Sequence, residues 1–136
     1  MIVVSPEAPA ESIVAFVKGW MKLLAEGRVE EACNLLDEPN SYGNTWTPRL
    51  IEETISSTFS PDSRFYETHP EGPIFTDPFE LEEQIEIEVV EFDDKRGYAF
   101  DYDVPLNGEW SDLTAQFEFL KRSDGYSVVL HDLHVL

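Results

Sequence analysis

The first part of the chain carries apolar residues at the spacing of amphipathic helices. The first stripe is formed by Ile13, Val17, Trp20 and Leu24, and Gly27 stands where a C-terminal cap residue is expected. The same periodicity over a shorter span predicts a second helix at 28–37. Thr47-Pro48 supplies an N-cap followed by a proline at the first helical position, so a third helix is expected from there to Ser60-Pro61.

Prolines and a glycine then interrupt the helical periodicity. The segment 62–77 combines them with aromatic residues: Pro70, Gly72 and Pro73 with Phe65, Tyr66 and Phe75. This composition is typical of an irregular connection that is anchored by its rings. We therefore predict no regular element there.

The last third of the chain alternates apolar and polar residues, as half-buried strands do. The alternation predicts strands at 85–89, 98–106, 113–119 and 126–135. Asn107-Gly108 is the pair that two-residue type I′ hairpins prefer, and it places Leu106 opposite Glu109. Counting from that turn predicts Tyr102 opposite Leu113 and Asp103 opposite Asp112.

The last predicted strand changes phase before its end. We favour a bulge near His131-Asp132, because it would restore a single apolar face. Two readings without a bulge stay open. A three-residue loop at 123–125 would turn inward Val129, His131, Leu133 and Val135. A two-residue loop at 124–125 would turn inward Tyr126, Val128, Leu130, Asp132 and His134.

Together these elements predict one α+β domain over residues 1–136, with N-terminal helices packed on a curved C-terminal antiparallel β-meander. Two patterns resemble the NTF2-like superfamily: Phe16-x3-Trp20-x2-Leu23-Leu24-x2-Gly27-x4-Ala32-x2-Leu35-Leu36 and Asp124-Gly125-Tyr126-x-Val128-x-Leu130-His131-x-x-His134. The segments 110–115 and 131–136 also resemble small bacterial proteins of that type. The resemblance implies an NTF2-like or cystatin-like cone. That fold hosts enzymes, small-ligand binders and interaction modules, so it implies no single function.

The charge of the chain narrows the range of partners. The formal net charge is -19, from 28 acidic and 9 basic residues, which argues against nucleic acid. Between Arg64 and Lys95 there are 11 carboxylates and no Lys or Arg. Such a field is either a solvated surface that aids solubility or one that attracts a cationic partner; on the second interpretation we expect a basic protein.

The single cysteine and the hydropathy of the chain bear on the cellular compartment in which we expect the protein. Cys33 is the only cysteine, so an internal disulfide is excluded. The longest mainly apolar stretch, 13–25, contains Lys18 and Lys22 and is shorter than the roughly 20 residues of a membrane span. We expect a cytoplasmic protein that does not bind membranes.

The densest group of chemically active side chains is His131, Asp132 and His134 in the last strand. A histidine oriented by a carboxylate can act as a general base. However, neighbouring residues of a strand point to opposite faces, so His131 and Asp132 share a pocket only if a bulge rotates them. The spacing matches no metal motif, and we expect neither a metal nor a cofactor.

Acidic residues of the predicted sheet are the candidate binding residues. They are Glu86, Glu88, Asp101, Asp103, Asp112 and Glu118. The leading hypothesis is a non-catalytic protein-interaction module, similar to an immunity or inhibitor protein, that binds a basic partner. The alternative is a cone-pocket small-ligand binder or enzyme that uses Asp132 with His131 or His134. A homodimer through the sheet is also expected, because Leu133, Val135 and Leu136 need to be covered.

Overall fold

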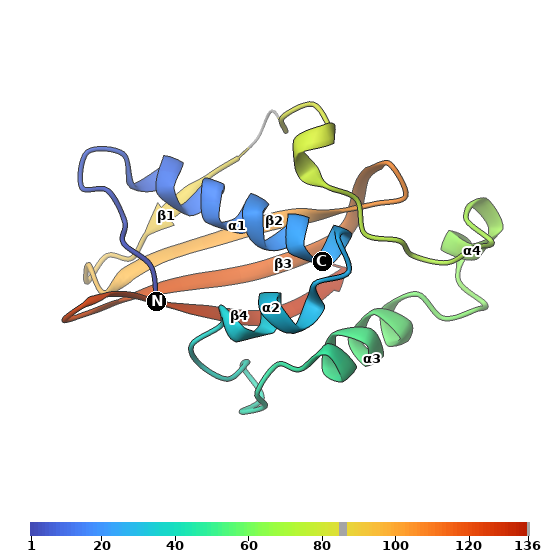
Figure 1. Ribbon diagram of the computed structural model, residues 1–136, viewed down its shortest axis with the longest axis horizontal. Coiled ribbons are helices and arrows are strands. Elements are labelled where there is room, and N and C mark those ends of the chain that lie inside the picture. The colour runs from blue at the N-terminus through green and yellow to red at the C-terminus, as the bar shows by residue number, and fades with distance from the viewer. Residues whose placement is uncertain (85–86, 136) are drawn as a thin grey trace.

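The chain places its helices first and its sheet last. The computed structural model describes residues 1–84 and 87–135 (Figure 1). The helical elements are α1 (Pro9–Ala25), α2 (Val29–Asn34), α3 (Pro48–Thr58), α4 (Arg64–Thr68) and the 3₁₀ turn η1 (Pro78–Glu80). The strands are β1 (Val89–Glu91), β2 (Gly97–Leu106), β3 (Glu109–Arg122) and β4 (Gly125–Val135), in one antiparallel sheet of order β1-β2-β3-β4. The predicted α+β meander is confirmed.

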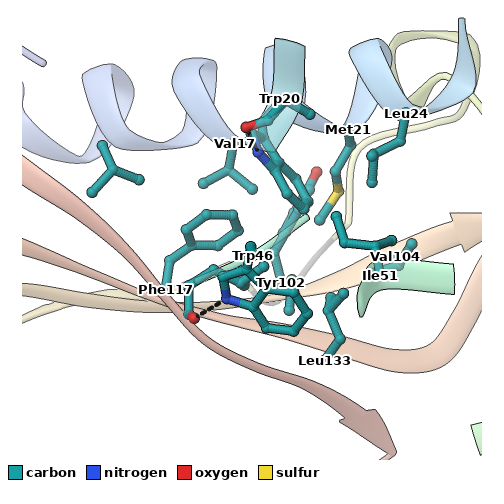
Figure 2. Packing of buried hydrophobic residues seen from close by; sticks show 14 of the residues in the cluster. Val17, Trp20, Met21, Leu24, Trp46, Ile51, Tyr102, Val104, Phe117 and Leu133 are labelled. Atoms are coloured by element: carbon teal, nitrogen blue, oxygen red, sulfur yellow. Dashed lines mark hydrogen bonds between the residues drawn. The ribbon is translucent and has the colours of Figure 1, made fainter. Parts of the chain in front are cut away.

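Helix α1 packs its apolar stripe against one face of the sheet. Figure 2 shows Val17, Trp20, Met21 and Leu24 pointing from α1 toward the strands. The Trp20 ring meets Phe117 edge-on, with centroids 5.3 Å apart, and its Nε1 donates to the Ala32 carbonyl of α2 at 2.9 Å. Gly27, at φ +78°, follows the end of α1 as predicted, because a glycine adopts this conformation without a Cβ penalty.

Helix α2 is shorter than the predicted 28–37, because Asp37 bonds to the sheet. The Asp37 N–H donates to the Val128 carbonyl and the Asp37 carboxylate accepts from the Val128 N–H, both at 2.8 Å. Farther along, Trp46 Nε1 donates to the Leu130 carbonyl at 2.7 Å (Figure 2). The segment after α2 thus occupies the edge of β4, which removes exposed backbone groups that could pair with another chain.

Helix α3 begins as predicted, with the Thr47 hydroxyl accepting from the Leu50 N–H at 3.1 Å. The prediction of no regular element at 62–77 is wrong, since α4 lies within it. The Phe65 ring of α4 packs on Phe59, with centroids 4.5 Å apart. This contact with the end of α3, six residues earlier, stabilises a single helical turn that backbone propensity alone would not hold.

The Asn107-Gly108 hairpin turn is confirmed. Asn107 and Gly108 have φ values of +52° and +84°, as a type I′ turn requires, and Leu106 pairs with Glu109.

The register predicted for β2 and β3 beyond the turn is wrong by two residues, because Tyr102 pairs with Ala115 rather than with Leu113. The ladder shifts between Asp103 and Pro105, where Val104 alone faces the three residues of β3 at 111–113. Proline has no N–H for the ladder, and the Ser111 hydroxyl bonds the Val104 carbonyl there. A shift of two keeps every side chain on its face, so the buried side was predicted correctly.

The predicted bulge in β4 is confirmed, while neither predicted loop is present. Phe117 pairs with Leu130 and Gln116 with Asp132, which leaves His131 as the extra residue. The loop consists of residues 123 and 124, since Arg122 pairs with Gly125. The predicted first strand is also wrong in position, because β1 begins only at Val89; its predicted residues Ile85 and Glu86 lie outside the described residues.

Rings fill the space between α1 and the sheet. Phe100 stacks on Tyr102 with centroids 5.2 Å apart, and Phe117 stacks on Phe119 at 5.9 Å. All four side chains are buried. The interior that could have formed a cone pocket is therefore packed with aromatic side chains at this end. Along residues 1–84 and 87–135, no helix has the length and apolar character needed to cross a membrane.

Candidate functional site

The face of the sheet turned away from α1 carries the candidate functional site. Side chains alternate along strands, so the neighbours of the buried rings point outward. We call these outward positions the outer face: Ala99, Asp101 and Asp103 of β2, Thr114, Gln116 and Glu118 of β3, and Val129, His131, Asp132 and His134 of β4.

The strand register arranges the outer face in rows. Asp101, Gln116 and Asp132 form one row across β2, β3 and β4. The adjacent rows place Asp103 beside Thr114, and Ala99 beside Glu118. The outer face thus holds four carboxylates and no Lys or Arg at the positions that define it.

His131 pairs with Glu118 across the outer face. Its Nε2 lies 2.7 Å from Glu118 Oε1, and the side chains are 36% and 16% exposed. This contact exists because the bulge turns His131 outward, next to a residue of the neighbouring strand. The imidazole and the carboxylate hold each other in place at the surface.

His134 and Asp132 form a second pair. His134 Nδ1 lies 3.2 Å from Asp132 Oδ2, at an angle too poor for a hydrogen bond. Asp132 also accepts from the Tyr42 hydroxyl at 3.4 Å and from the Leu133 N–H at 2.8 Å. The predicted trio is therefore divided between two pairs, and His131 is oriented by Glu118 rather than by Asp132.

Neither a metal site nor a cavity is seen at His131, Asp132 and His134 among the described residues. Within the described part of the chain, no group of three or more His, Cys, Asp or Glu side chains is placed to hold a metal ion. The two cavities described below are lined by none of His131, Asp132 and His134.

The remaining predicted binding residues do not share one surface. Asp101 is exposed on the outer face, and Asp103 beside it accepts from Gln84 Nε2 at 2.9 Å. The prediction that Asp103 opposes Asp112 is wrong, because the shifted register pairs Asp103 with Thr114. Asp112 lies in the irregular part of β3 and lines a cavity near α4. Glu88 is exposed just before β1, and Glu86 lies outside the described residues.

Two cavities near α4 escaped the sequence-based prediction. The first, of about 440 Å³, is lined in part by Arg64, His69, Trp110 and Asp112. His69 Nδ1 lies 3.6 Å from Glu71 Oε1, and its Nε2 lies 3.5 Å from Glu109 Oε1. No motif singled out His69, because its neighbours in the cavity come from β3, far away in the sequence.

The second cavity is a groove of about 410 Å³ between α3 and the segment that runs from Tyr66 of α4 through the following loop to Phe75. Its wall joins residues of α3 with Tyr66, Glu71 and Phe75. We call it the α3 groove. No pattern in the sequence indicated this groove beyond the aromatic and proline content of the loop.

Cys33 behaves as a core residue. Burial raises the pKa of the Cys33 thiol, and the Glu30 carboxylate raises it further. A thiol with a raised pKa is a poor nucleophile at neutral pH.

Comparison with known proteins finds one family. The model of a family described as a domain of unknown function, DUF7668, matches residues 21–136. No curated protein and no solved structure matches the chain. The matched region includes the whole sheet, so the outer face and both cavities lie inside it.

Proposed function

Because the chain belongs to the DUF7668 family, whose description assigns no activity, we propose a function from its surface: a non-catalytic module that binds a basic protein through the outer face. The observation that carries this proposal is the set of four carboxylates on one side of the sheet. They are Asp101, Asp103, Glu118 and Asp132.

The shape of the molecule makes this surface available. Helix α1 packs on the opposite side of the sheet (Figure 1). Asp101 is exposed, and Asp103, Glu118 and Asp132 are half-buried. An acidic patch without Lys or Arg raises the local concentration of a cationic partner and speeds its association. The net charge of -19 adds to this attraction at a distance. An immunity or inhibitor protein that neutralises a basic target would have this electrostatic design.

Two carboxylates of the outer face are ordered by hydrogen bonds, which favours a role in binding. Asp103 is fixed by Gln84, and Glu118 by His131. Side chains that are already ordered lose less conformational freedom when a partner binds. The outer face therefore offers partly preorganised carboxylates to the Lys and Arg side chains of a partner.

The test compares two double variants with equal loss of charge. Asp101→Asn/Asp103→Asn changes the outer face, and Glu80→Gln/Asp112→Asn changes exposed carboxylates elsewhere. Proteins retained on each variant from native lysate are identified, and their binding kinetics are measured across ionic strength. We expect the outer-face variant to lower the association rate about three- to tenfold at low salt, with little change in dissociation.

The control variant distinguishes binding at the outer face from attraction by the net charge of the whole molecule. If both double variants slow association equally, the attraction belongs to the whole molecule and the outer face is not the binding site. If neither variant changes association, the proposal of an electrostatic interface fails.

The alternative function, an enzyme or small-ligand binder at His131, Asp132 and His134, has no cavity to support it among those described. We therefore place these residues within the binding surface.

We also infer that the fold is a variant of the NTF2-like cone. Helices at the N-terminus, with the apolar side of α1 packed on a C-terminal antiparallel meander, support this inference. An experimental structure with helices packed on both sides of the sheet would contradict it.

The cytoplasm remains the compartment that we propose, because the single thiol of Cys33 suits a reducing environment. A homodimer through the sheet stays a prediction. Leu133 is covered by the chain's own core, whereas Val135 is 46% exposed.

A further inference from the structure

We propose that the α3 groove binds a small organic cation, with an ammonium group carried on an apolar body. The groove encloses about 410 Å³, within the range of small-molecule sites. Its residues come from α2, α3, α4 and the loop that follows α4, so the groove exists only in the folded chain. This inference is independent of the proposed function, because no residue of the outer face lines the groove.

The floor of the groove is apolar. Val29, Ile51, Ile55 and Phe75 contribute to its lining. A ligand that covers them gains from removing apolar surface from water. The bound molecule should therefore carry a hydrocarbon body.

The rim of the groove is negative. Glu52 of α3 and Glu71 of the loop both line it, and the described lining residues include no Lys, Arg or His. Two carboxylates above an apolar floor favour a cationic head group on the ligand and disfavour an anion. The charge of the lining thus selects the chemical class of the ligand.

Glu71 is held ready for a cation. Its Oε1 accepts from Asn107 Nδ2 at 2.8 Å. Hydrogen bonding from its own backbone N–H and from the Asn107 side chain keeps the pKa of Glu71 below its ordinary range. The carboxylate therefore stays charged at neutral pH, and its position is set before a ligand arrives.

Tyr66 forms a wall of the groove against the loop backbone. Its hydroxyl oxygen lies 3.2 Å from the place that a Cβ on Gly72 would occupy, and Gly72 has φ +84°. A glycine at this position lets the tyrosine ring approach the loop closely.

The first experiment compares three probes that share an apolar chain: n-hexylammonium, n-hexanol and hexanoate. Backbone amide NMR follows Gly72 in the groove and Gly19 on α1 as the reference. We expect a saturable shift of the Gly72 signal with n-hexylammonium only. An equal response to n-hexanol would overturn the role of charge, and the absence of any shift at Gly72 would overturn the site.

Three single variants then test the carboxylates. Glu71→Gln and Glu52→Gln should each raise the Kd for n-hexylammonium about three- to tenfold. Gln at position 71 keeps an oxygen for Asn107, so the loop should stay in place. Glu53→Gln removes the same charge from the next residue of α3, where Glu53 pairs with Arg49 at 2.8 Å, and should leave the Kd unchanged. Equal effects of all three variants would overturn the proposal.

A peptide probe distinguishes a free amine from a lysine of another protein. N-acetyl-lysine methylamide carries an ammonium group on an alkyl chain within a peptide unit. We expect it to bind more weakly than n-hexylammonium, because its polar peptide groups gain nothing from an apolar floor. Tighter binding of the lysine derivative would overturn the assignment to a free small amine.

Discussion

Tyr102 brings a hydroxyl group into the core beneath α1. Its side chain is 1% exposed, and the hydroxyl has no hydrogen-bond partner among the described residues. Burial raises the pKa of Tyr102 to about 12, and the Glu83 and Asp103 carboxylates contribute to the rise. The residue fills space between Phe100 and Trp110, while its polar atom opposes folding.

Tyr102→Phe should therefore leave the protein as stable as the wild type or stabilise it by about 1 kcal/mol at pH 7, because the ring remains and an unpaired polar group is removed. Urea denaturation measures the change, with Tyr42→Phe as an exposed control. A loss of more than about 1 kcal/mol would mean that the hydroxyl has a partner.

The same variant should change the response to alkaline pH. Above pH 10 the unfolded Tyr102 loses its proton while the folded one keeps it up to about pH 12. Unfolding is thereby favoured as the pH rises, by about 2 to 3 kcal/mol across that window. Tyr102→Phe should lose less stability than the wild type between pH 10 and 12. Parallel stability curves for the two proteins would contradict the raised pKa.

At the scale of elements, Asn107 joins the β2–β3 turn to the loop that lines the α3 groove. It adopts φ +52° in the turn. Its side chain donates to Glu71 and to the Gly72 carbonyl, and accepts from the Ile74 N–H. One residue thus sets a local backbone conformation and anchors a segment more than 30 positions away.

Two substitutions separate these roles. Asn107→Gly keeps the positive φ and removes the side-chain bonds, whereas Asn107→Ala removes the bonds and disfavours the turn. We expect both to destabilise, with Asn107→Ala worse by about 1 kcal/mol in chemical denaturation. Equal losses would show that the tether to the loop matters more than the turn.

The hairpin also shows how far local pattern reaches. Asn107-Gly108 and the alternation of apolar residues predicted the turn and the buried side of both strands. They missed the two-residue shift at Pro105, because the irregular ladder depends on how the Ser111 hydroxyl meets the Val104 carbonyl across the strands. Helix α4 escaped for a similar reason, since its contact with Phe59 of the preceding segment holds it.

At the scale of the whole molecule, self-repulsion is the dominant electrostatic feature. The net charge is -19. Among the described residues, Lys and Arg side chains pair with eight of the 28 acids, for example Lys18 with Glu83 at 2.9 Å and Arg122 with Glu38 at 2.8 Å, so acids without a Lys or Arg partner remain in excess. Compact packing of so many like charges opposes folding.

Raising the salt concentration from about 0.02 M to about 0.5 M should therefore raise the thermal midpoint, because shorter Debye lengths screen the repulsion. Asp101→Asn/Asp103→Asn should show a smaller rise, since two neighbouring charges are gone. Thermal unfolding by circular dichroism measures both. A midpoint that falls with salt would mean that attractive ion pairs outweigh the repulsion.

The candidate site, like the fold, has some features that the sequence predicts and others that it does not. Its acidic character and the outward direction of Asp101, Asp103 and Glu118 could be predicted from composition and strand period. The pairing of His131 with Glu118 could not, because it depends on the register between β3 and β4, which the loop at 123–124 sets and neither predicted loop gave. The α3 groove was missed entirely, since Glu52 and Glu71 meet only after α3 and the loop pack together.

By itself the sequence determined the three main helices, the β2–β3 hairpin, the buried sides of these elements and the charge of the molecule, because backbone propensity, side-chain period and ionisation are properties of neighbouring residues. Only the tertiary structure decided which strand residues face each other, where Asp112 lies and which carboxylates share a cavity. These depend on contacts between distant segments, whose geometry is set by the packing of the whole core around Trp20 and Phe117.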